Sequence, residues 1–235
     1  MKKTLLLSLV MTIALGGLVF AQDAGDPNPE EIGITSAQQK LKEVSVSKME
    51  DAGLWYGIMA SDEGLIQLRR FEGSPLDKEP IEGEEEAGID EPDDFVLGAK
   101  VSFYKRGAST FSIRPVRPLP IEGITKTISV WVAGRNTNHV LQLEISDHFG
   151  NTAFINMGKL NFVGWKKVTV SVPPSIVQRD YHYNNKMGIT IQGFNILCDL
   201  DETYGNYYIY LDDIRAVTDL FAEESRDEDD IIDAW

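Results

Sequence analysis

Residues 164–172 read Gly-Trp-Lys-Lys-Val-Thr-Val-Ser-Val, and in their second half every other residue is apolar. Val168, Val170 and Val172 alternate with polar residues. Successive side chains of a strand point to opposite faces of a sheet, so this period of two predicts a strand with one buried and one open face. The strand should end at Pro173-Pro174, because proline cannot continue a central strand.

The same alternation recurs along the second half of the chain. It is found in residues 101–104, 111–113, 128–132, 141–145, 154–155, 189–196 and 207–217. No amphipathic helical pattern separates these runs, and parallel strands would need such crossover helices. Seven or eight strands without helices predict an all-β fold, namely an antiparallel β-sandwich of the jelly-roll type.

The first 21 residues have the pattern of a secretory signal peptide. Two lysines precede an apolar run over residues 5–20, and the pattern closes on Val19-Phe20-Ala21. The run is shorter than the ~20 apolar residues that a bilayer span needs. We therefore expect cleavage before Gln22, a mature protein in the periplasm, and no membrane association after cleavage.

The rest of the chain divides by composition. The expected parts are an extended N-terminal leader over 22–39, a β-sandwich domain over 40–218 that contains a long acidic loop over 73–94, and an acidic C-terminal tail over 219–235. The single cysteine, Cys198, excludes an intrachain disulfide and lies in an apolar run. We expect it to be a small buried residue of the core rather than a nucleophile.

Charge is concentrated in two segments of a chain whose formal net charge is −15. Residues 77–94 hold ten acids and one lysine, residues 219–235 hold eight acids and one arginine, and residues 95–218 carry 13 bases and 9 acids. This distribution disfavours nucleic-acid binding, which needs a basic footprint. The acidic segments are either solvated chain or docking elements for a basic surface. Apolar residues in the tail, Trp235 among them, favour docking.

No pattern of catalytic residues is present. His139, His148 and His182 lie outside any recognisable nucleophile arrangement, and His148 follows Asp147 in a predicted turn. Glu144 falls on the outward side of its strand, but no second carboxylate can be assigned for glycoside hydrolysis. We expect no catalytic and no cofactor-binding residues.

Two sets of acids could offer oxygen ligands to a structural calcium ion. They are Asp199, Asp201 and Glu202, and the pair Asp212 and Asp213. The first set lacks the glycine and the distal glutamate of an EF-hand loop. Loop acids are usually hydrated, so the sequence leaves calcium open and predicts no other cofactor.

Aromatic residues give the candidates for contact with a carbohydrate or a protein partner. These are Trp131, Tyr208, Tyr210 and Trp235, whereas Trp165 is expected to cap the edge of the core. Sugar rings stack on exposed aromatic side chains, so binding requires Trp131 and Tyr210 to be open on one face. Burial of both in the core would remove the main support for a carbohydrate site.

Three segments resemble a known family. Ile128-Ser-Val-Trp-Val132, Gly164-Trp-Lys-Lys-Val-Thr-Val170 and Tyr208-Ile-Tyr-Leu-Asp-Asp-Ile214, behind a signal peptide, are similar to the outer-layer (sheath) proteins of spirochaete periplasmic flagellar filaments. The last two motifs also occur in galactose-binding-like and carbohydrate-binding jelly rolls.

The resemblance implies a non-enzymatic structural subunit. Such a subunit coats the flagellin core filament, associates with itself and with other sheath proteins, including paralogues, and contributes to filament stiffness or curvature and to motility. The alternative function is a periplasmic or surface carbohydrate-binding jelly-roll module.

Overall fold

The structure is a computed structural model that describes residues 25–32, 39–81, 93–180 and 184–221. The predicted signal peptide, the middle of the acidic loop, His182 and Trp235 lie outside the described residues. Within the described ranges, no helix is both long and apolar enough to cross a membrane.

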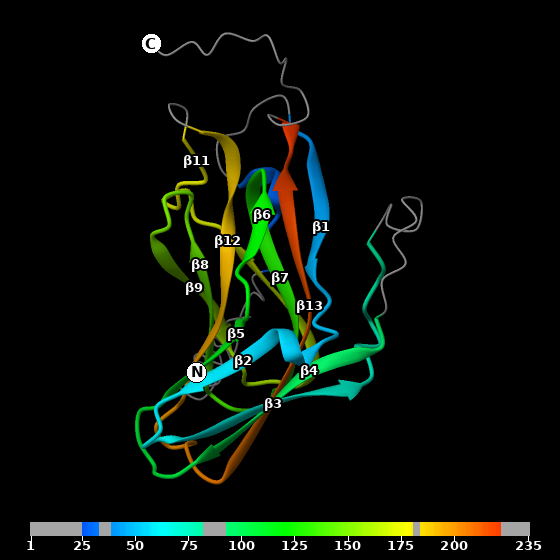
Figure 1. The fold of residues 1–235 in the computed structure, drawn as a ribbon. Coiled ribbons are helices and arrows are strands. Elements are labelled where there is room, and N and C mark those ends of the chain that lie inside the picture. The colour runs from blue at the N-terminus through cyan, green and yellow to red at the C-terminus, as the bar shows by residue number, and fades with distance from the viewer. Residues whose placement is uncertain (1–24, 33–38, 82–92, 181–183, 222–235) are drawn as a thin grey trace, which may run out of the picture.

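Two antiparallel sheets form the molecule (Figure 1). The six-stranded sheet has the order β10 (Val163–Ser171), β7 (Ile124–Arg135), β13 (Asn206–Asp219), β4 (Phe95–Phe103) and β3 (Gly64–Glu72), and β1 (Leu41–Ser47) pairs with the second half of β13. The seven-stranded sheet has the order β2 (Trp55–Met59), β5 (Thr110–Pro115), β12 (Asn184–Leu197), β8 (Val140–Ser146) and β9 (Thr152–Lys159), and β6 (Leu119–Glu122) and β11 (Arg179–Asp180) pair with β12. Two short 3-10 helices, η1 (Pro29–Glu31) and η2 (Ala52–Leu54), complete the described elements.

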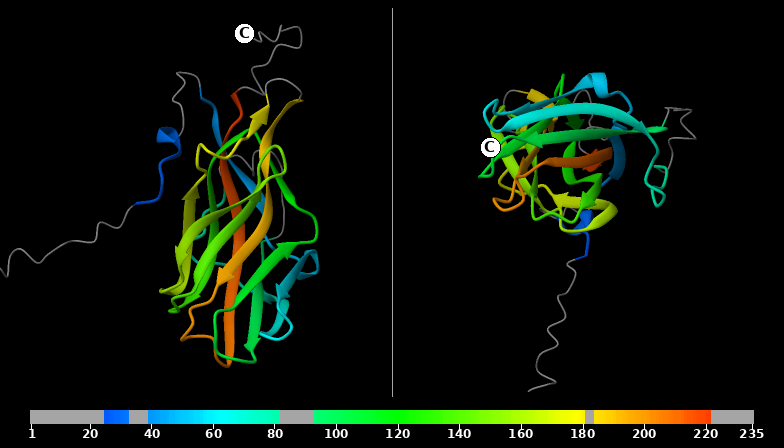
Figure 2. Two further views of the ribbon diagram at one scale, coloured as in Figure 1. Left: turned by 90° about the vertical axis from the view of Figure 1, so that its left-hand side faces the viewer. Right: turned by 90° about the horizontal axis from the view of Figure 1, so that it is seen from below.

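The core lies between the two sheets and is built from the alternating apolar positions. Buried residues of the six-stranded sheet include Leu97, Val101, Ile128, Val130, Val132, Ile209 and Leu211, and those of the seven-stranded sheet include Ile113, Leu141, Leu143, Ile145, Ile191 and Phe194. Figure 2 shows the elongated sandwich from two further directions, with β12 and β13 running along its length. The predicted antiparallel β-sandwich is confirmed.

A bulge in β13 changes which side chains face outward. The pairing of β13 with β7 shifts register between Asp212 and Arg215, and Asp213 has a positive φ of 49°. Aspartate is among the residues that tolerate this left-handed conformation. Leu211 and Ile214 both belong to the core. The two consecutive aspartates between them therefore lie on the outer side of the sheet.

The ends of the acidic loop are fixed to the sandwich. The Gly73 amide donates to the Asp94 carbonyl oxygen at 2.9 Å, and the carboxylate of Glu50 accepts from the amides of Asp94 and Phe95 at 3.1 Å. The described part of the leader also touches the domain, because Lys126 Nζ donates to the Ile32 carbonyl oxygen at 2.9 Å.

Candidate functional site

The outer face of the six-stranded sheet carries a row of aligned side chains from five strands. Strand register places Arg69, Gly98, Tyr210, Ala133 and Trp165 side by side, in that order. Residues paired across neighbouring strands point to the same face of a sheet. This row has the parity opposite to the core residues, so it belongs to the outer face.

Gly98 opens a groove in this face. A Cβ at Gly98 would lie 2.5 Å from Phe71 Cε2 and 3.0 Å from Tyr210 Cδ1. Without it, the rings of Phe71 and Tyr210 meet edge to face over the strand, with centroids 5.4 Å apart. Beside them lies a hollow of about 220 Å³ that Arg69, Lys100 and Tyr208 also line. We call this hollow the aromatic groove.

The aromatic residues singled out in the sequence are separated in the structure. Tyr208 is 39% exposed and lines the aromatic groove with the partly buried Tyr210. Trp131 shares their face but is only 9% exposed, although it does not belong to the main core. The prediction for Trp165 is wrong, because its register with Ala133 places it on the outer face rather than at the core edge. Trp235 lies outside the described residues.

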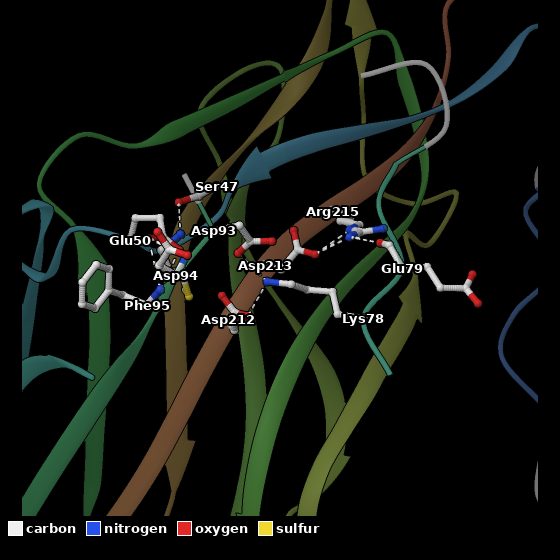
Figure 3. A network of polar contacts seen from close by, with 11 residues as sticks. Ser47, Glu50, Lys78, Glu79, Asp93, Asp94, Phe95, Asp212, Asp213 and Arg215 are labelled. Carbon is white, nitrogen blue, oxygen red and sulfur yellow. Dashed lines mark hydrogen bonds and ion pairs between the residues drawn. The ribbon is translucent and has the colours of Figure 1, made fainter. Parts of the chain in front are cut away.

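Residues 75–81, the strap, cross the outer face of the sheet next to Trp131. Asp212 is the register partner of Trp131, and Lys78 Nζ contacts Asp212 Oδ2 at 2.7 Å and Asp93 Oδ1 at 2.5 Å. Arg215 on β13 makes a second contact with the strap. It donates to the Glu79 carbonyl oxygen and to Asp213 Oδ2, both at 2.6 Å. Figure 3 shows this network between the strap and β13.

The charges in the network are deeply buried. Asp212 is 0% and Asp213 2% exposed. Burial raises the pKa of Asp212 to about 6, against the opposing effect of the Lys78 ammonium. Burial by itself would lower the pKa of Lys78, but its hydrogen bonds to Asp212 and Asp93 outweigh that effect and raise it. Lys78 thus stays charged at neutral pH and fastens the strap to the sheet.

The two acid sets considered for calcium have other partners. Asp212 forms an ion pair with Lys78, and Asp213 forms one with Arg215, so each carboxylate has its own cationic side chain. Glu202 accepts from the backbone and side-chain nitrogens of Asn138. In the ranges that the structure describes, no cluster of three or more His, Cys, Asp or Glu residues is arranged to hold a metal. The absence of a cofactor, with calcium as the open alternative, stays a prediction.

The outer face of the seven-stranded sheet carries a polar network that sequence reasoning missed. Arg114 Nη2 contacts Glu144 Oε2 at 2.6 Å, and Asn195 Nδ2 donates to the same oxygen at 3.1 Å. Ser112 in turn donates to the side-chain oxygen of Asn195. Glu144 does lie on the outward side, as predicted. Its partners come from β5 and β12, which are distant in sequence, and only the polar parity of those strands could have indicated them.

Exposed aromatic side chains stand at both edges of this network. Tyr56 on β2 pairs in register with Arg114, and Phe154 on β9 pairs with Glu144. These two rings are 44% and 55% exposed. Gly193 lies between Arg114 and Glu144, where a Cβ would come within 2.8 Å of Arg114 Cγ. We call the hydrogen-bonded side chains of Ser112, Arg114, Glu144 and Asn195, together with the rings of Tyr56 and Phe154 at their edges, the polar row.

The remaining candidates for chemistry have structural roles. His139 is fully buried, its Nδ1 accepts from the Asp199 amide at 3.0 Å, and burial lowers its pKa. Burial raises the pKa of the partly buried Cys198 to about 12, so its thiol stays protonated at neutral pH. Asp147 accepts from the amides of Phe149 and Asn151 and closes the predicted turn.

Sequence comparison identifies the family. Residues 19–226 match the family described as flagellar filament outer layer protein Flaa. The chain belongs to this family. A flagellar filament outer layer-like protein of Brachyspira hyodysenteriae is 36% identical over 223 residues, which are 92% of this chain and 100% of that relative. The resemblance seen in the sequence is confirmed.

Solved carbohydrate-binding modules are similar to this chain in structure. A family 61 module in complex with β-1,4-galactotriose has 10% identity and a TM-score of 0.41, and covers 75% of this chain and 99% of that module. A second carbohydrate-binding module, from a study of promiscuous specificity in the β-sandwich superfamily, has 14% identity and a TM-score of 0.44. The match covers 79% of this chain and 64% of that one. These values carry no functional conclusion.

The family match spans the described sandwich from its leader to the end of β13. The strap, the aromatic groove and the polar row all lie inside the matched region. Residues 227–235, which include Ile231, Ile232 and Trp235, follow it.

Proposed function

We propose that this chain is a non-catalytic structural subunit that coats the flagellin core of a periplasmic flagellar filament. It reaches the periplasm through its cleaved signal peptide and contributes to the stiffness or curvature of the filament, and hence to motility. The observation that carries this proposal is the family match over residues 19–226. Its partners are the flagellin core, other outer-layer proteins including paralogues, and further copies of itself.

The properties of the sandwich support a role as a coat subunit. Its core joins two sheets into one body, and both outer faces carry aromatic and charged groups that can meet neighbours. Charge is also segregated along the sequence. Residues 95–218 carry a small excess of bases, and the segments that precede and follow them, 77–94 and 219–235, are acidic. Complementary charge steers association and sets the register between subunits.

Co-sedimentation tests the proposal directly. Purified residues 22–235 are mixed with flagellar filaments stripped of their outer layer, across a salt series, with an unrelated β-sandwich of similar net charge as control. We expect saturable binding that weakens as salt rises, because exposed charges are screened. Absence of binding at every salt concentration would contradict direct coating of the core.

The polar row favours carbohydrate binding as a second candidate function. Planar hydrogen-bonding side chains between two exposed rings match the needs of a sugar, whose faces stack and whose hydroxyls accept and donate. A glycan panel tests it. Tyr56→Ala and Phe154→Ala should each abolish a binding signal that Tyr104→Ala, a control at a 65% exposed position, leaves unchanged. A panel without any signal would remove this candidate.

A further inference from the structure

The aromatic groove carries positive charge without an acidic partner. Arg69 and Lys100 line it, and Arg135 lies with its guanidinium carbon 5.3 Å from the centroid of the Tyr210 ring. Lys100 Nζ stands 6.0 Å from the centroid of the Tyr208 ring. Within the described residues, none of these three cations forms an ion pair, and no carboxylate lines the groove.

Such a groove suits a ligand that combines negative charge with apolar side chains. Arginine and lysine bind carboxylates through charge-assisted hydrogen bonds. The exposed rings of Phe71 and Tyr208, 44% and 39% exposed, offer apolar contact area beside the cations. The aromatic groove therefore calls for an acidic peptide that contains apolar or aromatic residues.

One segment of this chain has that composition. Residues 222–235 contain seven acids and one arginine, interspersed with Ile231, Ile232 and Trp235. The acidic stretch 82–92 is a poorer match, because its six acids are accompanied by no aromatic residue. The match in charge and in apolar content selects residues 222–235, the part of the predicted C-terminal tail that follows the described residues, and below we use the name acidic tail for this part only.

The groove and the last described residues before the acidic tail lie at opposite ends of β13. Tyr208 and Tyr210 are near the first residue of the strand, and Asp219 is its last residue. Asp219 lies nine positions after Tyr210, which corresponds to about 30 Å at the rise of a strand. Figure 1 shows β13 running along the length of the molecule between these ends.

We propose that the aromatic groove of one copy binds the acidic tail of a second copy of this chain. The groove lies at one end of the sandwich, and the chain continues into the acidic tail from the other end. The contact therefore joins different surfaces of the two subunits. A contact of this heterologous kind leaves a free groove and a free tail at the ends of each pair, so it can repeat along a filament. The inference deepens the proposed function, on which it rests for its setting, by naming the contact between subunits.

Sedimentation velocity of residues 22–235 over a concentration series tests the contact. We expect self-association that weakens with salt. The groove variant Arg69→Glu/Lys100→Glu and the tail variant Asp229→Lys/Asp230→Lys should each weaken association by about tenfold or more, since paired charges become like charges. The control Lys42→Glu/Lys159→Glu changes two exposed lysines elsewhere and should associate as the wild type does.

Mixing the two variants gives the decisive result. The groove variant keeps a native tail and the tail variant keeps a native groove, so an equimolar mixture should form a heterodimer but no longer chain. Association of either variant at wild-type strength, or a wild type that is monomeric throughout, would overturn the inference. So would a tail that binds its own groove, which would show as tail-dependent compaction without concentration dependence.

The same variants separate this inference from the proposed function. If they lose self-association but still co-sediment with stripped filaments, coating stands and its subunit contact is as inferred. If wild-type protein co-sediments and the groove variant self-associates normally, only the inference fails. If wild-type protein self-associates through the groove but does not bind filaments, only the coating proposal fails.

Discussion

At the scale of single residues, the buried charges beneath the strap are the most consequential feature. Asp212 and Asp213 are almost without solvent contact, and their cations come from Lys78 on the strap and Arg215 on β13. One carboxylate oxygen of each aspartate has no hydrogen-bond partner among the described residues. A buried ion pair adds little stability in itself, but removing one partner leaves an uncompensated charge. The strap is therefore held by a contact that is costly to break.

Replacing Lys78 tests how strongly this contact holds the strap. Lys78→Met should lower the free energy of unfolding by about 3 kcal/mol at pH 7, because Asp212 would remain buried without its cation. Urea denaturation followed by circular dichroism measures the change. Lys105→Met is the matched control, since Lys105 pairs with Asp62 at an exposed position, and it should leave stability unchanged. A loss that Lys78→Met/Asp212→Leu fails to reverse would contradict this explanation.

The raised pKa of Asp212 predicts a specific pH dependence. A carboxyl whose pKa rises on folding, here from 3.8 to about 6, binds its proton more tightly in the folded state. The associated stability is present below about pH 4 and is lost as pH rises to about 6. Asp212→Asn stays neutral, so its free energy of unfolding relative to wild type should increase by about 3 kcal/mol across that window. Urea titrations at four pH values measure the difference, and a difference that is independent of pH would refute the assignment.

At the scale of elements, irregularities in the two long strands create the outer surfaces. The bulge at Asp213 turns two consecutive acids outward on β13. On the other sheet, the pairing of β12 with β8 shifts register between Ile191 and Gly193. Gly193 has a φ of 141° and no side chain, so it leaves space for Arg114 to reach Glu144. Bulges commonly redirect side chains at such sites.

Gly193→Ala tests whether β12 needs a residue without a side chain at this position. A Cβ there would lie 2.5 Å from the Ile113 carbonyl oxygen and 2.8 Å from Arg114 Cγ, so both the strand pairing and the polar row must shift. We expect a loss of about 2 kcal/mol in the free energy of unfolding, through backbone strain and a weakened Arg114–Glu144 pair. Thermal and urea unfolding measure it. Ala153→Gly on β9 is a control that changes the same group on the same sheet, and an equal or larger effect there would point to general strand propensity instead.

At the scale of the whole molecule, the sandwich depends on one core without covalent reinforcement. The core cluster draws residues from both sheets, and Cys198 is the only cysteine. A single shared core of this kind unfolds cooperatively in most domains of moderate size. The strap and the described leader add contacts at its outer surface.

Unfolding of residues 22–235 should consequently follow one transition. Tryptophan fluorescence includes Trp55 of the core and Trp131, the largely buried register partner of Asp212, whereas far-UV circular dichroism reports the strands. We expect the two probes to give coincident urea transitions, and a reducing agent to leave the midpoint unchanged. Two separated transitions would mean that one sheet or the strap unfolds independently.

Alternation of apolar residues was enough to determine the fold class, since Val130, Val132, Leu141 and Leu143 occupy the core positions that a period of two requires. The same reasoning placed Glu144 on the outward side of its strand. It also predicts a loop over residues 73–94, because glycine, proline and acids interrupt every period there, and the structure describes residues 73–81 and 93–94 of that segment.

Only the tertiary structure decided which of those outward residues are accessible and which have partners. Trp131 and Tyr210 have the same strand parity, yet the strap approaches the sheet beside one and leaves the other in a groove. Lys78 and Asp212, like Arg114 and Glu144, are far apart in the chain and meet only through strand order and bulges. Parity is a local property of the backbone that the sequence carries directly. Long-range pairing depends on how the sheets are assembled, so burial and ion pairing at the surface could not be predicted from the local pattern.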